Sequence, residues 1–565
     1  MAGGPKRPVN VFRLTRGDMP KEMLNWKLWF AVLSFGLMGA ARGVDEGLIG
    51  GVFDSADFQK SINLDSYSSV EQANIQGNVS AMVQLGSVGG ALFAFLVCDR
   101  VGRIWAARGL CVLWVLGIAI FMGHNGSLGA VYAGRFIAGL GVGQTPVVGP
   151  VYLAEIAPAQ VRGLCTAIFS GFVYLGIFLA YFANYGCEIH MGDDTHNRWL
   201  VPTSLHIIFA GIIFILTFFQ IESPRFLVKK NKFDEALHNL SRIRCLPPDH
   251  EHVVQEITAI RNSHEAEMEA TLGLGWVGIL KEAVLIPSNL YRLYLSTCVQ
   301  ILSQWSGVGS ITVYAPELFS LLGIDGTEGS LLVTAVFGLV KLVAGMVCAL
   351  FLIDVIGRKR ALLIGITLQI ISMTYIAAFL TDSPQLGVDD SFTLPDSKIG
   401  ASRGAVAMIY ISGVGWALGW NSVIYLLTAE LFPLRIRALA TSTAMTLHFV
   451  NQYGTSRAVP NMLLPTADGG IDPKGTFWCF AAVTILGGIW VLFSIPETAG
   501  RSLESMDALF QLPWYKIGLF GNRDAERRDL VEQKLGEEKE MSAVPVGVSQ
   551  EGKAEEGRVE NVIRT

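Results

Sequence analysis

The stretch Asp99-Arg-Val-Gly-Arg103 follows one long apolar run of the chain and recurs as Asp354-Val-Ile-Gly-Arg358 after another. Other charged residues repeat between the two halves with one common offset: Glu155 and Arg162 return as Glu430 and Arg437, and Glu222 returns as Glu497. Duplicated halves are typical of secondary transporters, which hold substrate near the membrane midplane between the repeats. The repeat therefore predicts two matching halves.

The composition excludes a soluble protein. The chain has 565 residues, of which 51% are hydrophobic and only 16% are charged, whereas soluble domains carry about 25% charged residues. A membrane-spanning helix needs about 20 apolar residues. Runs of that order lie at 26–50, 74–98, 104–123, 128–151, 163–185, 202–221, 291–320, 328–353, 360–380, 402–428, 437–459 and 475–495. We therefore predict an all-α polytopic membrane protein with twelve transmembrane helices in two six-helix halves.

Basic residues predict the orientation, because cytoplasmic loops are enriched in Lys and Arg. Arg100, Arg103 and Arg108 join the second and third runs, and Arg358, Lys359 and Arg360 join the eighth and ninth. We expect a multi-pass protein of the plasma membrane with both termini in the cytoplasm. The expected parts are an N-terminal tail (1–25), a six-helix bundle (26–221), a cytoplasmic helical loop (222–290), a second bundle (291–496) and a C-terminal tail (497–565).

Several functional classes are not expected. The net charge of −5 offers no basic footprint for nucleic acid. The eight cysteines form no CxxC pair, so neither a metal site nor a redox site is predicted, and no cofactor motif is present. No nucleophile–base constellation indicates an enzyme. The expected partners are a small molecule, protons and the lipid bilayer.

Charged residues at the predicted cytoplasmic helix ends indicate a gate. Acidic and basic groups there can pair between neighbouring helices and interact with helix dipoles. The alternative is that the basic residues only fix the orientation. The gate candidates are Asp99, Arg103, Glu155, Arg162, Glu222, Arg225, Asp354, Arg358, Glu430 and Arg437.

Ionisable residues inside the predicted spans are functional candidates, since each costs about 2.5–3.5 kcal/mol at the membrane centre on insertion scales. The first run holds Arg42, Asp45 and Glu46, whose spacings of three and four place them on one helix face. Arg135, Lys341 and His448 lie in later runs.

Longer motifs resemble the sugar porter family of the major facilitator superfamily, particularly its fungal sugar, sugar-acid and quinate proton symporters. They are "DRVGR", "GRFIAGLGVG", "YLAEIAPAQVRG", "ESPRFL", "VYAPELF", "DVIGRKR", "AELFPLRIRA" and "PETAGRSLESM". The resemblance implies the major facilitator fold and alternating access. It also implies that Asp45 carries the proton and that Arg135 pairs with it, although Val44 replaces the usual aromatic residue. A static pair, or a pair of Asp45 with Arg42, is the alternative.

The resemblance also implies a substrate site, but one that departs from the hexose pattern. Ser303, Gly309 and Ser170 stand where amide side chains are usual, and His448 stands in place of a Gln. Arg42 replaces a common Phe, and Lys341 lies within about a residue of a usual Asn. The remaining candidates are Gln304, Trp420, Asn421 and Tyr425.

The two added cations favour an acidic substrate, because a buried cation needs a partner and Arg can bind a carboxylate through two hydrogen bonds. We therefore expect a proton symporter for a monosaccharide-sized acid such as a uronate or quinate. Arg42 could instead pair with Asp45 or Glu46, Lys341 with another acid, and His448 could be a hydrogen-bonding liner. The alternatives are a transporter of neutral hexose or pentose, and a nutrient sensor that signals without carrying substrate.

Overall fold

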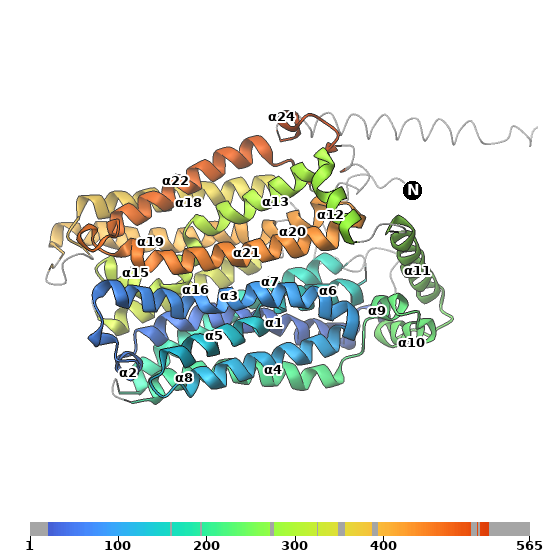
Figure 1. The fold of residues 1–565 in the computed structure, drawn as a ribbon, viewed down its shortest axis with the longest axis horizontal. Helices are drawn as coiled ribbons and strands as arrows, with labels where there is room; N and C mark the ends of the chain where they lie inside the picture. Colours follow the sequence, from blue (N-terminus) through green and yellow to red (C-terminus); the bar gives the residue numbers. More distant parts are fainter. Residues whose placement is uncertain are drawn as a thin grey trace, which may run out of the picture.

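A computed structural model describes residues 21–158, 161–192, 195–271, 276–324, 326–348, 356–386, 392, 394–498, 506 and 509–518. Within these residues the chain forms helices and connecting loops, without a β-strand. Most of the helices run alongside one another in a single bundle, and the N-terminal and C-terminal halves of the chain occupy its two sides (Figure 1). The all-α prediction is confirmed.

The N-terminal half contains six spanning segments. Its helices are α1 (Trp26–Phe53), α3 (Ser69–Val101), α4 (Arg103–Met122), α5 (Leu128–Val142), α6 (Thr145–Ile156), α7 (Arg162–His190) and α8 (Asn197–Leu216), with the short α2 (Ala56–Ser61) after the first. Helices α5 and α6 together make one span, Leu128–Ile156. The start of α3 has a capping box, in which Ser68 and Glu71 each bond the other's backbone N–H.

The C-terminal half repeats this arrangement with more interruptions. Its helices are α13 (Pro287–Trp305), α14 (Val308–Val313), α15 (Ala315–Leu321), α16 (Thr327–Val347), α18 (Arg358–Asp382), α19 (Asp396–Leu418), α20 (Trp420–Leu431), α21 (Leu434–Leu463) and α22 (Asp472–Ser494), followed by the short α24 (Trp514–Ile517).

Nine helical segments of the described chain are long and apolar enough to cross a membrane. Three further segments complete the twelve predicted transmembrane segments. They are α13 to α15, α19 with α20, and α21. The predicted runs 291–320 and 402–428 are each divided into shorter helices. The first breaks at Gly307, whose φ of +88° favours glycine, and the second breaks at Gly419. Helix α21 is continuous but carries polar side chains, including His448 and Gln452.

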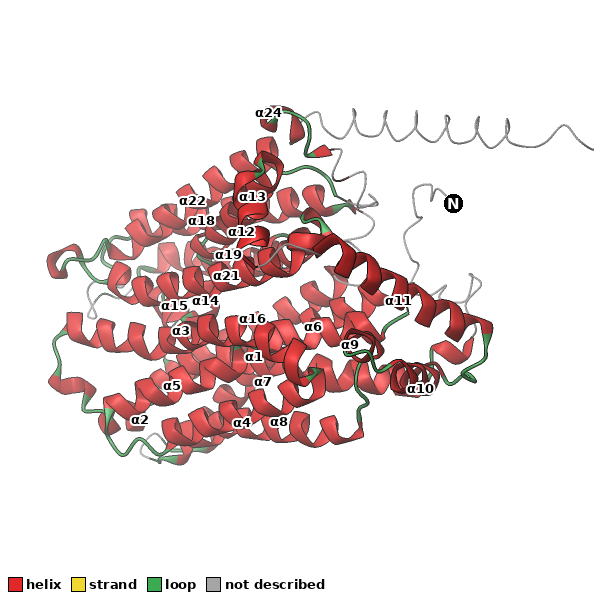
Figure 2. Ribbon diagram, turned by 45° about the vertical axis from the view of Figure 1, so that its right-hand side comes forward, coloured by secondary structure: helices red, strands yellow, loops and turns green. Residues whose placement is uncertain are grey.

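The stretch between the halves is helical, as its periodicity predicts. It forms α9 (Pro224–Lys229), α10 (Phe233–Arg244), α11 (Glu251–Thr271) and α12 (Trp276–Leu285). Figure 2 shows α9, α10 and α11 beyond one end of the bundle. We call that end the loop end, and the opposite end, where α2 lies, the far end.

The two halves are joined by buried packing. One hydrophobic cluster contains the far-end part of α1, including Ile49 and Phe53, together with many residues of the C-terminal half. The loop-end part of α1, including Leu28 and Phe35, belongs to a second cluster built from the N-terminal half and Ile243 of α10. Polar contacts reinforce the junction at the far end, where Gln76 donates to Glu317 at 2.8 Å.

Candidate functional site

Helix α1 carries the first group of ionisable residues and packs closely on α7. A Cβ atom at Gly39 or Gly43 would overlap the backbone carbonyl of Phe169 or Val173, so only glycine permits this approach. Small residues at such interfaces let membrane helices come into backbone contact. The close packing fixes the rotation of α1, and with it the directions of Arg42 and Asp45.

Asp45 forms an ion pair with Arg135 of α5. The Nη1 atom of Arg135 lies 2.7 Å from Oδ1 of Asp45, and each residue is 2% exposed. Arg135 also donates from Nε to the carbonyl of Val79 on α3 at 3.2 Å. The structure thus brings together the two residues that the sequence singles out for proton coupling.

A third ionisable group, His206 of α8, adjoins the pair and was not among the sequence candidates. Its Nε2 atom lies 3.4 Å from the same Oδ1 of Asp45. A lone His within the apolar run 202–221 was the available signal. The intramembrane cluster therefore contains an acid, a guanidinium and an imidazole.

Arg42 makes different contacts from Asp45. Its Nε donates to Glu46 one turn along α1 at 3.1 Å, and its Nη2 lies 3.1 Å from Nε2 of His448 on α21. The guanidinium also lies over the ring of Phe449, at 5.4 Å. Arg42 is therefore engaged by Glu46, one of the partners that the sequence left open.

The contacts of His448 define its protonation. Arg42 can only donate, so Nε2 of His448 accepts and the ring proton lies on Nδ1. Nδ1 then donates to Oε1 of Gln300 on α13, which is 3.0 Å away. The Nε2 atom of Gln304 lies 3.3 Å from the same nitrogen. His448 is thus a neutral hydrogen-bonding residue that links α1 to α13.

Two amide residues of this network were missing from the sequence candidates. Gln300 is completely buried and lies one turn before Gln304, so the spacing of four residues was its signal. Gln452 of α21 donates to Glu46 at 3.2 Å. Arg42–His448 and Glu46–Gln452 thereby join the two halves across the middle of the bundle.

Lys341 of α16 is the second cation at this level. It is 1% exposed, and its Nζ donates to the hydroxyl of Thr312 at 2.7 Å. The ammonium also lies 5.6 Å from the ring centre of Tyr174 and 5.3 Å from that of Phe337. No carboxylate of the described residues lies within ion-pair distance of it.

The other candidate substrate-binding residues differ in their burial and in their hydrogen bonds. Ser303 is buried and donates to the carbonyl of Gln300 at 2.9 Å. Trp420 is buried with no hydrogen-bond partner for Nε1 among the described residues, so this N–H is a candidate donor to substrate. Gly309 adjoins the Gln304 side chain. Ser170 and Asn421 are half-buried, and the Tyr425 side chain lies outside the described part of the structure.

At the loop end, Arg103 contacts three acidic residues, two from the N-terminal half and one from the start of the stretch between the halves. It donates to both carboxylate oxygens of Glu155, at 2.9 and 2.7 Å, and lies 3.3 Å from Asp99. Its backbone N–H and that of Ile104 donate to Glu222. Burial raises the pKa of Glu222 above its usual range, although these backbone N–H groups oppose the rise.

The C-terminal half repeats one part of this arrangement. The backbone N–H groups of Arg358 and Lys359 donate to Glu497 at 2.8 and 3.2 Å, as those after Gly102 do to Glu222. Gly102 and Gly357 have φ of +101° and +91°, and a Cβ at either position would meet the carboxylate.

The other gate candidates are only partly described. Arg225 lies on α9, and its Nε has no hydrogen-bond partner among the described residues. Asp354 lies outside the described residues, as do the side chains of Arg162, Glu430 and Arg437. The described contacts of Arg103 remain within the N-terminal half and the start of the stretch between the halves.

Replacing Arg103 with Gln is expected to lower kcat about tenfold or more and to change KM less than about threefold. Removing one partner of a buried ion pair costs about 3–5 kcal/mol in the conformation that contains the pair. Such a loss shifts the conformational equilibrium without touching substrate. The measurement is initial transport rate against concentration for purified protein in vesicles. Arg100→Gln is the control, because Arg100 is exposed in the same motif. An increase in KM at unchanged kcat would contradict the gate role.

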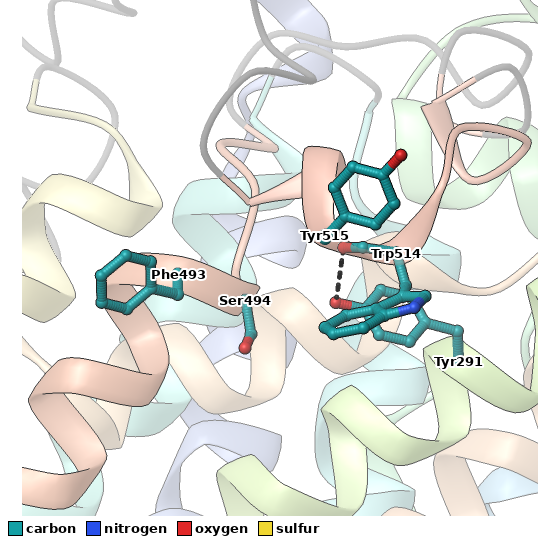
Figure 3. Close-up of a pocket in the computed structure, with 5 residues that line it drawn as sticks. All are labelled: Tyr291, Phe493, Ser494, Trp514 and Tyr515. Atoms are coloured by element: carbon teal, nitrogen blue, oxygen red, sulfur yellow. Dashed lines mark hydrogen bonds between the residues drawn. The ribbon is translucent and has the colours of Figure 1, made fainter.

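The described surface also has a pocket of about 260 Å³ lined by Tyr291, Phe493, Ser494, Trp514 and Tyr515. Figure 3 shows the hydroxyl of Tyr291 bonded to the carbonyl of Trp514, a distance of 3.4 Å. The lining is mainly aromatic and contains no charged side chain. This pocket lies at the junction of α13, α22 and α24, apart from the ionisable residues of the bundle.

Comparisons with known proteins agree with this architecture. A family model described as "Sugar (and other) transporter" matches residues 31–510. The probable quinate permease of Aspergillus niger is 33% identical over 494 residues, covering 87% of this chain and 89% of that protein. The probable quinate permease of Aspergillus terreus is 31% identical over 498 residues, covering 87% and 88%.

Among solved structures, the proton:xylose symporter XylE bound to 6-bromo-6-deoxy-D-glucose matches with a TM-score of 0.69 and 22% identity. The match covers 86% of this chain and 99% of that one. A second XylE structure, partially occluded and inward open, matches with a TM-score of 0.67 and 21% identity. At this identity the likeness concerns the fold.

Two six-helix halves around buried ionisable residues form a multi-pass membrane protein with the fold of XylE, a solved member of the major facilitator superfamily. The chain belongs to the sugar (and other) transporter family, because the family model spans most of its length.

Proposed function

We propose that this protein is a proton symporter that carries a monosaccharide-sized carboxylate, such as quinate or a uronate, by alternating access. The observation that carries the proposal is Lys341, a cation buried between α14 and α16 whose described hydrogen bond is to a hydroxyl. A charge in a low-dielectric site is costly unless it is paired. A substrate carboxylate supplies the missing charge.

The polar residues around Lys341 support a hydroxylated substrate. Trp420 offers a buried N–H, and the Gln300, Gln304 and His448 group offers amide and imidazole atoms. The positive charge of Arg42 is balanced by Glu46, which forms an ion pair with it, so Arg42 is a weaker candidate than Lys341 for binding a substrate carboxylate. The relatives named as probable quinate permeases are consistent with an acidic, polyhydroxylated substrate.

Proton coupling is assigned to the Asp45 and Arg135 pair. Breaking the pair would leave a buried carboxylate that favours its protonated form. The name of the XylE relative, a proton:xylose symporter, is consistent with this assignment.

The proposed orientation places the loop end in the cytoplasm of a cell and the far end outside the plasma membrane. It follows from the basic residues near Arg103 and Arg358. Residues 26–221 and 291–496 are then the two bundles, and 1–25, 222–290 and 497–565 are cytoplasmic.

The net charge that crosses the membrane in each transport cycle tests the proposed function. One proton and one monoanion move no net charge, whereas one proton and one neutral sugar move one charge. Purified protein in proteoliposomes should therefore take up quinate with internal acidification but with little current, at zero membrane voltage. Competition by quinate, glucuronate, glucose and xylose ranks the substrates. A large current with glucose, and glucose outcompeting every acid, would favour a neutral-sugar transporter. Signalling in cells without any flux would favour a sensor.

A further inference from the structure

His206 lies between an acceptor on its own helix and the carboxylate of Asp45. Its Nδ1 is 2.9 Å from the backbone carbonyl of Thr203, and its Nε2 is 3.4 Å from Oδ1 of Asp45. The residue is 2% exposed, and the indole of Trp114 meets its ring edge to face at 5.8 Å. Nε2 makes no hydrogen bond to any described residue.

These contacts determine where the ring proton lies. A backbone carbonyl only accepts, so Nδ1 must carry a hydrogen and donate it to Thr203. In the neutral ring, Nε2 then presents a lone pair toward Asp45. A lone pair facing a carboxylate makes no hydrogen bond, and one added proton converts the contact into a charge-assisted one.

We propose that Nε2 of His206 is the atom that takes up the coupled proton, with Asp45 remaining ionised as its partner. This inference rests on the proposed symport and specifies the proton-binding atom within it. In the step, a proton from water bonds to the Nε2 lone pair and the ring becomes an imidazolium. On release the same N–H bond breaks and the proton returns to water on the other side.

The charged groups around His206 explain how this proton could influence the transport cycle. Asp45 faces it from α1, and Arg135 of α5 contacts the same Oδ1 atom at 2.7 Å. Helix α4 contributes the uncharged Trp114, and α7, which also packs on α8, contributes no ion pair to the imidazole among the described residues. An imidazolium would therefore compete with Arg135 for one oxygen. Proton uptake would weaken the pair that joins α1 to α5.

An imidazole is also chemically suited to take up and release the coupled proton. It is the side chain whose unperturbed change of charge falls between about pH 5 and 8, where cells maintain proton gradients. A carboxylate held by a guanidinium stays ionised over that range unless the pair breaks.

The experiment uses purified full-length protein in proteoliposomes with quinate as the probe and an internal pH dye. His206→Gln keeps an amide that can donate to Asp45 but cannot titrate. We expect it to lose at least tenfold in quinate-driven proton entry and to lose accumulation, while quinate counterflow stays within about threefold of wild type. His206→Glu replaces the imidazole with another titratable group, so it should restore proton entry with a pH profile of uptake that differs from that of wild type.

The control is His190→Gln. His190 bonds a backbone carbonyl of its own helix in the same way, at 2.9 Å from Gly186, but it is exposed and makes no ion pair with a described carboxylate. It should match wild type. Full proton entry and an unshifted pH profile in His206→Gln would overturn the inference. If His206→Gln proves inactive in counterflow as well, His206→Glu decides: an unshifted profile in that variant also overturns it.

The wild-type protein separates this inference from the proposed function. Absence of any quinate-driven proton entry in wild type contradicts the symport itself. Proton entry in wild type that persists in His206→Gln contradicts only the role of His206, and returns the proton to Asp45.

Discussion

Replacing Lys341 with Met is expected to raise KM for quinate about a hundredfold, while KM for glucose or xylose changes less than about threefold. Met keeps the length and apolar stem of Lys, so the packing against Tyr174 and Phe337 is retained. The variant lacks only the charge. Leaving a carboxylate unpaired in a buried site costs about 3–5 kcal/mol, of which every 1.4 kcal/mol is a factor of ten in affinity.

The measurement is the initial uptake rate against concentration, for both substrate classes, with the same purified variant in proteoliposomes. Lys398→Met is the control. Lys398 lies outside the bundle core and forms an ion pair with the exposed Asp382. Thr312→Val gives a second comparison, because it removes only the hydroxyl that holds Nζ. Equal losses for quinate and for neutral sugars would show that Lys341 supports the fold and not the recognition of an acid.

The second large effect is expected from Asp45→Asn, which should abolish accumulation of substrate against its gradient. The amide cannot balance the charge of Arg135 or hold an imidazolium at His206. A proton gradient of one pH unit is worth about 1.4 kcal/mol, and one coupled proton can therefore support about tenfold accumulation. The variant should equilibrate substrate to a ratio of about one. Exchange of substrate for substrate should persist, because it requires no net movement of protons.

Uptake and counterflow in the same vesicles test this expectation. The control is Asp65→Asn, because Asp65 is an exposed acid in the short helical turn Leu64–Ser66 after α2. Concentrative uptake by Asp45→Asn at the wild-type ratio would remove Asp45 from the coupling mechanism. Loss of counterflow together with accumulation would instead indicate a damaged fold.

The fold class could be predicted from the sequence because bilayer thickness imposes a length on every span. Runs such as 104–123 and 475–495 are apolar over that length, and no soluble fold accommodates so many of them. The charged motif at Asp99 and its copy at Asp354 identified the duplication, because their spacing is visible without any contact. The helix breaks at Gly307 and Gly419 could not be located from hydropathy, since hydropathy does not register a local change of backbone direction.

The candidate site depended more on tertiary structure. Periodicity placed Arg42, Asp45 and Glu46 on one face of a helix but could not say which acid Arg42 would contact. The close packing of α1 on α7 decides this: Asp45 lies against α5 and α8, and Glu46 lies toward α21.

The sequence by itself thus determined the spans, the repeat and the types of charged residue inside the membrane, because these are local properties of the chain. The partners of those residues were decided only by the fold. Asp45 and His206 are far apart in sequence, as are Arg42 and His448. A side chain reaches its partner only when the rotation and depth of both helices are set, and these are set by packing with neighbouring helices.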